Sequence, residues 1–274
     1  MFNAADAFSA PEHQPFHLPG ERGAVLLVHG FGGTPAEMRG IGERLNAAGW
    51  AVHAPLLPGF GADFAALSRT THMEWIATVR DAHDALRREH RHTLLLGFSM
   101  GGAISISVAA ATPPDGLILI NPFTRLENWV WKLLPVVKTL FPSFKPFQVV
   151  KLDFESDETR RNIGQYMPDA DLTDPAVQEA VLSFSLPTRA LDELRAVGGK
   201  AWALAPRLRT PTLIVQSQRD KTVPPAITRQ LAERIPGARL LEIDAEHNFV
   251  QYDAERLDEA VGAIQAFLDG LRTP

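Results

Sequence analysis

The stretch that decides the fold is Thr93-Leu94-Leu95-Leu96-Gly97-Phe98-Ser99-Met100-Gly101-Gly102-Ala103-Ile104-Ser105-Ile106-Ser107. Its apolar run at 94–96 is typical of a buried strand, and residues 103–111 are typical of a helix without a polar face. Only residues 97–102 remain to turn the chain. Ser99, at the apex, is therefore expected in a strained backbone conformation that the flanking glycines permit.

Gly97, Ser99 and Gly101 form the Gly-x-Ser-x-Gly pattern of a nucleophile elbow. Such a turn projects a serine hydroxyl above the edge of a sheet and leaves the next backbone N–H, that of Met100, at the positive end of a helix. The alternative is a glycine-rich turn that only packs a helix on a sheet. The strand before the motif and the helix after it favour the elbow.

Length and composition are those of a globular protein with a large core. The chain has 274 residues, of which 45% are hydrophobic, and a formal charge of −5. Its charges are scattered, so nothing predicts binding to nucleic acid. Cysteine is absent, which excludes disulfides and thiolate metal sites. Because no apolar stretch has membrane-spanning length and residues 1–11 do not resemble a secretory signal, we expect a cytoplasmic protein without an integral membrane segment.

Buried strands alternate with helices along most of the chain, which predicts an α/β fold with a mostly parallel sheet and helices on both faces. Two Thr-x-x-Glu capping boxes, at 34–37 and 71–74, are expected to open helices that end at Gly49 and near His90. Asp253 is the expected N-cap of the last helix. The strands are predicted at residues 24–28, 50–54, 94–96, 116–120, 212–215 and 240–243, and two further helices at 225–235 and 254–268.

Residues 122–208 interrupt this alternation with aromatic, proline-rich and helical segments. An insertion of this length predicts a helical lid over the carboxyl edge of the sheet, where open α/β sheets bind ligands. Residues 1–121 and 209–274 then form the core. Trp129, Trp131 and Phe98 are the expected substrate-binding residues. The apolar lid residues favour an apolar ligand, although at least half are expected to form a satellite core: Trp129, Trp131, Leu134, Phe141, Phe144 and Phe147.

A serine hydroxyl needs a base to take its proton and a carboxylate to orient that base. Of the nine histidines, His247 follows the last predicted strand and precedes the last helix, which places it at the sheet edge of Ser99. The alternative is a solvated loop histidine.

Asp220 is the predicted acid because it follows the strand at 212–215 and precedes a helix. Asp244 lies too close to His247 in the same loop, and Asp253 is better explained as a helix cap. Some proteins of this architecture carry the acid after the strand that follows the elbow helix, where this chain has Asn121. An ion pair between Asp220 and an adjacent basic residue is the alternative.

An oxyanion needs two or more hydrogen-bond donors. The Met100 N–H is one. The loop His29-Gly30-Phe31-Gly32-Gly33 leaves the first buried strand at the same edge, and its glycines permit close approach of the backbone, so the Phe31 N–H is the expected second donor. His29 is expected to hold this loop by hydrogen bonds.

These motifs together carry a resemblance to a known family. The loop at 29–35, Pro55-Leu56-Leu57-Pro58-Gly59, the elbow, and the order serine, acid, histidine resemble an α/β-hydrolase, and the chain is most similar to bacterial carboxylesterases and monoacylglycerol lipases. The resemblance implies Ser99 as nucleophile, His247 as base, Asp220 as acid, and the Phe31 and Met100 N–H groups as oxyanion donors. Glu246 departs from the pattern, since glycine usually precedes the histidine.

The expected function is therefore that of a serine esterase that cleaves small-molecule carboxylic esters with an apolar short- to medium-chain acyl group, including monoacylglycerols. No cofactor or metal is required, and a monomer or homodimer is expected. Thioesterase, peptidase, carbon–carbon hydrolase and perhydrolase chemistry remain open, because the same three residues serve all of them. A non-catalytic ligand-binding protein and a lid that docks a protein partner are the alternatives outside catalysis.

Overall fold

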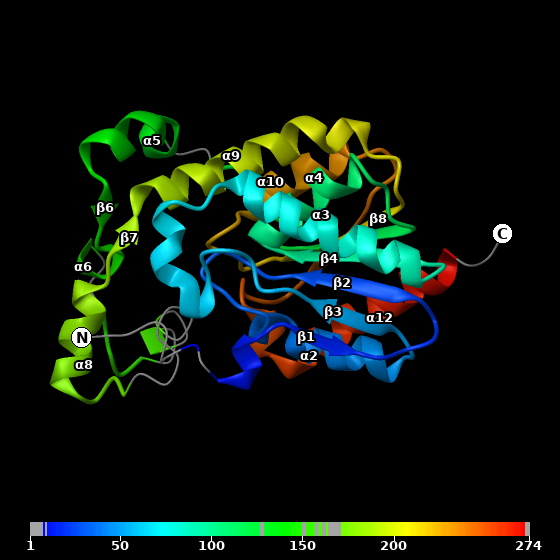
Figure 1. Ribbon diagram of the computed structural model, residues 1–274, viewed down its shortest axis with the longest axis horizontal. Coiled ribbons are helices and arrows are strands. Elements are labelled where there is room, and N and C mark those ends of the chain that lie inside the picture. The colour runs from blue at the N-terminus through cyan, green and yellow to red at the C-terminus, as the bar shows by residue number, and fades with distance from the viewer. Residues whose placement is uncertain are drawn as a thin grey trace.

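A seven-stranded sheet forms the centre of the computed structural model, which describes residues 8, 10–126, 129–149, 152–156, 159–160, 163 and 171–271 (Figure 1). Neighbouring strands are parallel except for the edge strand β1, which is antiparallel to β3. In spatial order the strands are β1 (Phe16–Leu18), β3 (Ala51–Ala54), β2 (Ala24–Val28), β4 (Thr93–Phe98), β5 (Gly116–Ile120), β8 (Thr212–Ser217) and β9 (Arg239–Ile243). The predicted parallel α/β architecture is confirmed.

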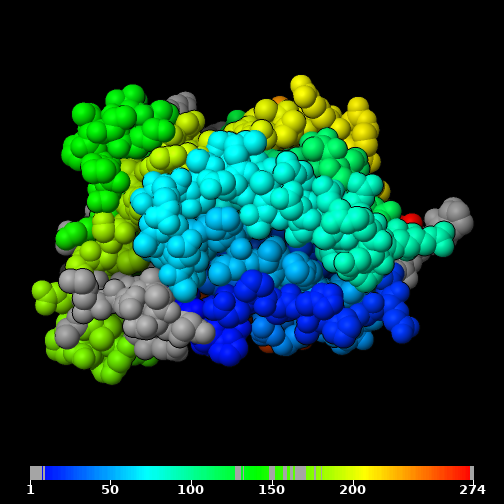
Figure 2. Space-filling model, viewed as in Figure 1, coloured from blue at the N-terminus to red at the C-terminus, as the bar shows by residue number. Residues whose placement is uncertain are grey.

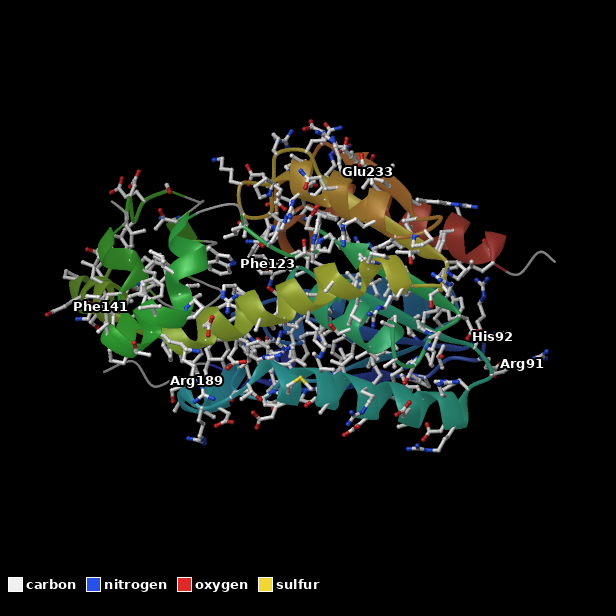
Figure 3. All side chains as sticks on the ribbon, turned by 90° about the horizontal axis from the view of Figure 1, so that it is seen from above. Arg91, His92, Phe123, Phe141, Arg189 and Glu233 are labelled. Atoms are coloured by element: carbon white, nitrogen blue, oxygen red, sulfur yellow. The ribbon has the colours of Figure 1, made fainter. Side chains whose placement is uncertain are left out.

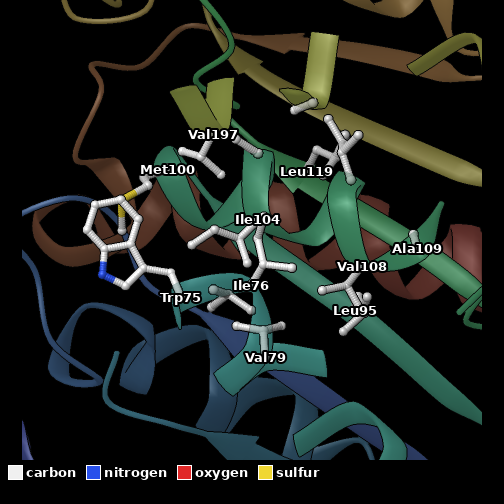
Figure 4. Close-up of a cluster of buried hydrophobic side chains, with 14 of the residues drawn as sticks. Trp75, Ile76, Val79, Leu95, Met100, Ile104, Val108, Ala109, Leu119 and Val197 are labelled. Carbon is white, nitrogen blue, oxygen red and sulfur yellow. The ribbon is translucent and has the colours of Figure 1, made fainter. Parts of the chain in front are cut away.

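Helices cover both faces of this sheet. Successive side chains of β2 point to opposite faces and all of them are buried, so each face needs a covering layer. Ala24, Leu26 and Val28 belong to a core cluster with α3 (His72–Glu89), α4 (Met100–Ala109), α9 (Thr188–Leu204) and α10 (Pro225–Arg234). In Figure 4, side chains of α3 such as Trp75 and Ile76 lie against those of α4. Val25 and Leu27 belong to a second cluster with α2 (Ala36–Ala47), α11 (Phe249–Tyr252) and α12 (Ala254–Gly270).

The segment between β5 and β8 forms one end of the molecule (Figures 1 and 2). Its elements are α5 (Trp129–Leu140), β6 (Ser143–Phe144), α6 (Pro146–Val149), α8 (Pro175–Ser183), β7 (Leu186–Pro187) and α9. Seen from above, α9 runs from this end along the body of the protein (Figure 3), and Val197 and Ala201 on it belong to the first core cluster. The limits predicted for a lid domain, 122 and 208, remain a prediction. Within the described ranges, no helix is both long and apolar enough to cross a bilayer.

Most element boundaries confirm the sequence predictions, although the two-residue strands β6 and β7 were not predicted. Thr71 and Glu74 form the predicted capping box of α3, and the Asp253 side chain caps α12. The capping box predicted at 34–37 is wrong: α2 has no side-chain cap, and the carboxyl of Glu37 accepts a hydrogen bond from the Gly30 N–H instead. The edge strand β1 was not predicted, because its alternation of half-buried Phe16 and Leu18 with exposed His17 covers only three residues, too few to indicate a strand. Short 3-10 helices span Pro11–His13, Gly61–Ser68 and Ala205–Arg207.

The turn between β4 and α4 depends on close backbone contact at its glycines. A Cβ on Gly101 would lie 2.1 Å from the Val28 carbonyl oxygen, which belongs to the neighbouring strand. We therefore expect Gly101→Ala to lower the free energy of unfolding by about 3 kcal/mol, because backbone cannot move aside as a flexible side chain can. Chemical denaturation measures this change.

Gly199→Ala provides the matched control for that prediction. Gly199 lies within α9, and a Cβ there would meet nothing within 4 Å. This variant is expected to gain up to about 1 kcal/mol of stability, because alanine has the higher helix propensity. Equal effects of the two substitutions would contradict the proposed role of close packing at the elbow.

Candidate active site

Ser99 occupies the sharp turn that the sequence predicts between β4 and α4. Its φ of 51° and ψ of −116° lie in a region that L-residues rarely adopt. The backbone around it is fixed by hydrogen bonds from the Ser99 N–H to the Ile120 carbonyl (2.9 Å) and from the Phe123 N–H to the Ser99 carbonyl (3.0 Å). These hydrogen bonds, to the end of the neighbouring strand β5 and to the loop after it, hold Ser99 in its strained conformation.

His247 and Asp220 come together at the ends of the adjacent strands β8 and β9. The His247 Nδ1 lies 2.6 Å from the Asp220 Oδ2, and the other carboxylate oxygen accepts the N–H groups of Thr222 (2.8 Å) and Val223 (2.7 Å). These contacts fix the carboxylate and orient the imidazole, whose Nε2 is then free to accept a proton. The rival acids are engaged elsewhere: Asp244 pairs with Arg219, and Asp253 caps α12.

Ser99 and His247 line one cavity of about 380 Å³ at the carboxyl edge of the sheet. Ser99 is only 7% exposed. Phe98 also lines the cavity, and its ring packs against the His247 imidazole with centroids 5.1 Å apart. A hydroxyl, an imidazole and a carboxylate thus lie at one rim of the sheet, and these are the residue types that acyl transfer uses.

Two backbone N–H groups are candidates to bind an anionic oxygen: that of Phe31, which lines the cavity, and that of Met100, which follows Ser99 in the chain. Met100 is the first residue of α4, and Phe31 lies in the loop after β2; in the described part of the chain neither N–H donates a backbone hydrogen bond. The loop is held as predicted by His29, whose Nδ1 lies 2.9 Å from the Gly30 carbonyl and whose Nε2 accepts the Leu57 N–H at 3.1 Å. His29 therefore carries its proton on Nδ1 and positions the peptide that ends in the Phe31 N–H.

The outer wall of the cavity is apolar and comes from the segment between β5 and β8. Of the predicted substrate-binding residues, Trp131 and Phe98 line the cavity, whereas the side chain of Trp129 lies outside the described part of the structure. Phe144 and Phe147 also line it, but Leu134 is buried elsewhere and Phe141 is 62% exposed. A satellite cluster exists and consists of Phe147, Ile163, Leu172, Val181, Phe184 and Leu186, with Phe144 packed against it. Of the six lid residues, at least half of which were predicted to form it, the described part of the cluster holds only Phe144 and Phe147, and Trp131 packs against the main core instead.

Asn121 and Ser217 form a buried network behind His247 that the sequence did not predict. The Asn121 Nδ2 donates to the His247 carbonyl (2.8 Å) and to the Ser217 Oγ (3.0 Å), and its Oδ1 accepts the Ser217 N–H (2.7 Å). The Ser217 hydroxyl in turn donates to the Glu246 carbonyl at 2.9 Å. Asn121 also has a positive φ of 44°. Its place in the sequence, where some proteins of this architecture carry the acid, is the one signal that pointed to it.

Glu37 is a second residue whose role the sequence did not reveal. It lies on α2, is 3% exposed, and lines the same cavity as Ser99. Its Oε2 accepts the Gly30 N–H at 2.7 Å. Burial raises the pKa of Glu37 from 4.5 to about 7, although the hydrogen bond from Gly30 opposes the rise. The local capping-box pattern obscured this contact, which spans seven residues.

This shift predicts a pH dependence of stability. Between pH 4.5 and about 7 the unfolded chain loses the Glu37 proton while the folded protein keeps it, so the free energy of unfolding falls as the pH rises. The expected loss is on the order of 3 kcal/mol. Glu37→Gln has no such group to titrate and does not suffer this loss. The difference in Tm between Glu37→Gln and the wild type is therefore expected to be roughly 5–10 °C more favourable to the variant at pH 8 than at pH 5.

The comparison between variants matters because His29 acts in the opposite direction. Burial lowers the pKa of His29 from 6.5 to about 4, so its contribution to stability is lost as the pH falls through that range. In the wild type the two effects oppose each other over overlapping pH ranges. Glu43→Gln, at an exposed position of α2, is the control. A Tm difference for Glu37→Gln that is the same at both pH values would contradict the prediction.

A parallel sheet with a serine on a strained strand-to-helix turn and a histidine–aspartate pair at the same edge defines the α/β-hydrolase class. The chain belongs to the hydrolase family described as serine aminopeptidase S33, whose family model matches residues 19–245. This result confirms the resemblance inferred from the motifs.

Relatives and solved structures agree with this membership. The chain is 29% identical to a thermostable monoacylglycerol lipase of Bacillus sp. strain H-257 over 213 residues, or 77% of this chain and 76% of that protein. It is 34% identical to a carboxylesterase of Bacillus subtilis strain 168 over 38% of this chain and 43% of that protein. A solved structure of the metagenome-derived lipolytic enzymes LipS and LipT is 26% identical, with a TM-score of 0.74 over 93% of this chain and 98% of that chain.

Proposed function

We infer that the protein is a serine esterase that cleaves carboxylic esters with apolar acyl chains, monoacylglycerols among them. The observation that carries this inference is the pairing of His247 with Asp220 at 2.6 Å beside a cavity that Ser99 also lines. Membership of the family and the names of the relatives, monoacylglycerol lipase and carboxylesterase, support the same reaction.

The proposed mechanism is a two-step acyl transfer. The Ser99 Oγ attacks the ester carbonyl carbon as its proton passes to the His247 Nε2, and the Phe31 and Met100 N–H groups stabilise the resulting oxyanion. The protonated His247 then gives this proton to the departing alcohol, which leaves an acyl group on Ser99. Water, deprotonated by His247, attacks the acyl carbon, and the proton returns to the Ser99 oxygen as the acid is released. Asp220 orients the imidazole throughout.

The lining of the cavity supports an apolar acyl group. The side chains that reach it from the segment between β5 and β8 are aliphatic or aromatic, including Phe123, Leu126, Trp131, Phe144, Phe147 and Leu194. Burial of a methylene group contributes about 0.8 kcal/mol, so each added carbon that fits the cavity strengthens binding.

We extend the proposal to three further properties of the protein. Residues 122–208 form a lid, the protein is a cytoplasmic monomer or homodimer, and the reaction needs no cofactor.

Aminopeptidase activity is the second candidate. The family description names it, and the buried carboxyl of Glu37 in the cavity could pair with the α-ammonium group of a peptide. The two functions differ in the bond cleaved and in the charge of the substrate, so one substrate panel separates them.

The decisive experiment measures hydrolysis of p-nitrophenyl esters with acyl chains of two to twelve carbons beside L-aminoacyl p-nitroanilides. We expect hydrolysis of the esters, with kcat/KM rising toward medium chains, and no release of nitroaniline. An organophosphonate should abolish the activity and leave an adduct on Ser99 in a peptide map. Hydrolysis of the anilides alone, or an adduct on another residue, would overturn the proposal.

A further inference from the structure

The carboxyl group of Glu37 is only half satisfied by the protein. One oxygen accepts the Gly30 N–H at 2.7 Å, while the other has no hydrogen-bond partner within the described part of the chain. The side chain is nevertheless 3% exposed and lines the cavity that Ser99 and His247 share. This second oxygen keeps some accessible surface, and Glu37 lines the cavity, so the oxygen is open to a hydrogen-bond donor on a ligand that enters it.

The loop that carries the Phe31 N–H is built closely around this carboxyl group. A Cβ on Gly33 would lie 2.2 Å from the Glu37 carboxyl carbon, and one on Gly30 would lie 3.3 Å from its Oε2. Both positions are glycine, which lets the backbone approach the acid. Glu37 is thereby fixed beside the loop that carries the Phe31 N–H, and it lines the same cavity as Ser99.

The cavity has two chemically different halves. The half formed by the segment between β5 and β8 is apolar or aromatic, whereas the half formed by the core presents, besides Phe31 and Phe98, all the hydrogen-bonding side chains of the lining: Glu37, Ser99, Thr222, His247 and Asn248. Among the described residues that line the cavity, Glu37 is the one with a carboxyl group. If the acyl chain of an ester fills the apolar half, the alcohol part lies in the polar half.

We propose that Glu37 forms a subsite for a hydroxyl group on the alcohol part of the substrate, so that esters of polyols are preferred to esters of simple alcohols. The inference rests on the proposed ester hydrolysis and names its substrate class. A hydroxyl group both donates and accepts a hydrogen bond, so it can bind the ionised and the protonated carboxyl group. An alkyl alcohol offers no donor and leaves the free oxygen of Glu37 unpaired.

A matched pair of substrates tests the subsite directly. 1-Monooctanoylglycerol and propyl octanoate have the same acyl group and the same three-carbon alcohol skeleton, and differ only in two hydroxyl groups. The wild type is expected to show a kcat/KM about tenfold higher for the glycerol ester. Glu37→Leu is expected to lower the ratio of the two kcat/KM values about tenfold, whereas Glu37→Gln, which retains an amide able to bind a hydroxyl group, should keep it within about threefold.

The ratio separates recognition from other effects of the substitution. Glu43→Leu, on the exposed face of α2, is the control and should leave the ratio unchanged. If Glu37→Leu slows both esters equally, Glu37 acts only through the Gly30 loop and the subsite is refuted. If Glu37→Leu does not fold, a wild type without preference for the glycerol ester refutes it equally well. Hydrolysis of neither ester by the wild type would instead refute the proposed function.

Discussion

Replacement of Asp220 by Asn is expected to lower kcat for ester hydrolysis about 10⁴-fold, with KM little changed. The N–H groups of Thr222 and Val223, at 2.8 and 2.7 Å, require an oxygen at one position of this side chain. The amide nitrogen of Asn is therefore directed to the other position, which faces the His247 Nδ1 at 2.6 Å. There it donates a hydrogen bond, so the imidazole must carry its proton on Nε2.

A proton on Nε2 removes the capacity of His247 to accept the hydroxyl proton of Ser99. Steady-state kinetics with a p-nitrophenyl ester measure the loss, and the Tm shows whether the fold is retained. Asp244→Asn is the matched control, because Asp244 pairs with Arg219 on the surface and should have less than about a twofold effect. A loss of less than tenfold for Asp220→Asn would mean that the hydrogen bonds of the Asn121 and Ser217 side chains to the His247 loop, rather than Asp220, orient the histidine.

The sequence was sufficient to predict this pair because chain order determines position in a parallel sheet. Both strands are predicted from short apolar runs; β8 is buried throughout, whereas β9 is an edge strand that is buried only at Ile243. The two strands pair in parallel from Leu213 and Arg239 to Ser217 and Ile243. The loops that follow such strands leave at the same edge of the sheet. Asp220 and His247 therefore had to emerge near each other, and near the serine turn that follows β4.

Contacts between loops could not be predicted in the same way. The pattern Thr34-Pro35-Ala36-Glu37 satisfies the local rule for a capping box, but the Glu37 carboxyl bonds the Gly30 N–H in a loop that only the tertiary structure brings close. The contacts of Asn121 with Ser217 and His247 span 96 and 126 residues. Periodicity and capping patterns act over a few residues, so neither could reveal these bonds.

Replacement of Ser99 by Ala is expected to lower kcat about 10⁶-fold, because it removes the proposed nucleophile and the remaining donors give only residual acceleration. The fold should be retained, since alanine at a φ of 51° bears nearly the same backbone strain as serine. Ser107→Ala, a buried serine on α4 that donates only to the Ala103 carbonyl, is the control and should keep its activity.

Because the backbone at position 99 is strained, the free energy of unfolding provides a second, independent measurement on variants of this residue. Glycine has no Cβ, so Ser99→Gly is expected to be as inactive as Ser99→Ala but more stable by about 1 kcal/mol in denaturant unfolding. A gain in stability together with loss of activity would show that the backbone strain at Ser99 is retained for the chemistry rather than for the fold. Equal stability of the two variants would contradict the strain at a φ of 51°. Hydrolysis by Ser99→Ala at more than about one hundredth of the wild-type rate would refute the proposed nucleophile itself.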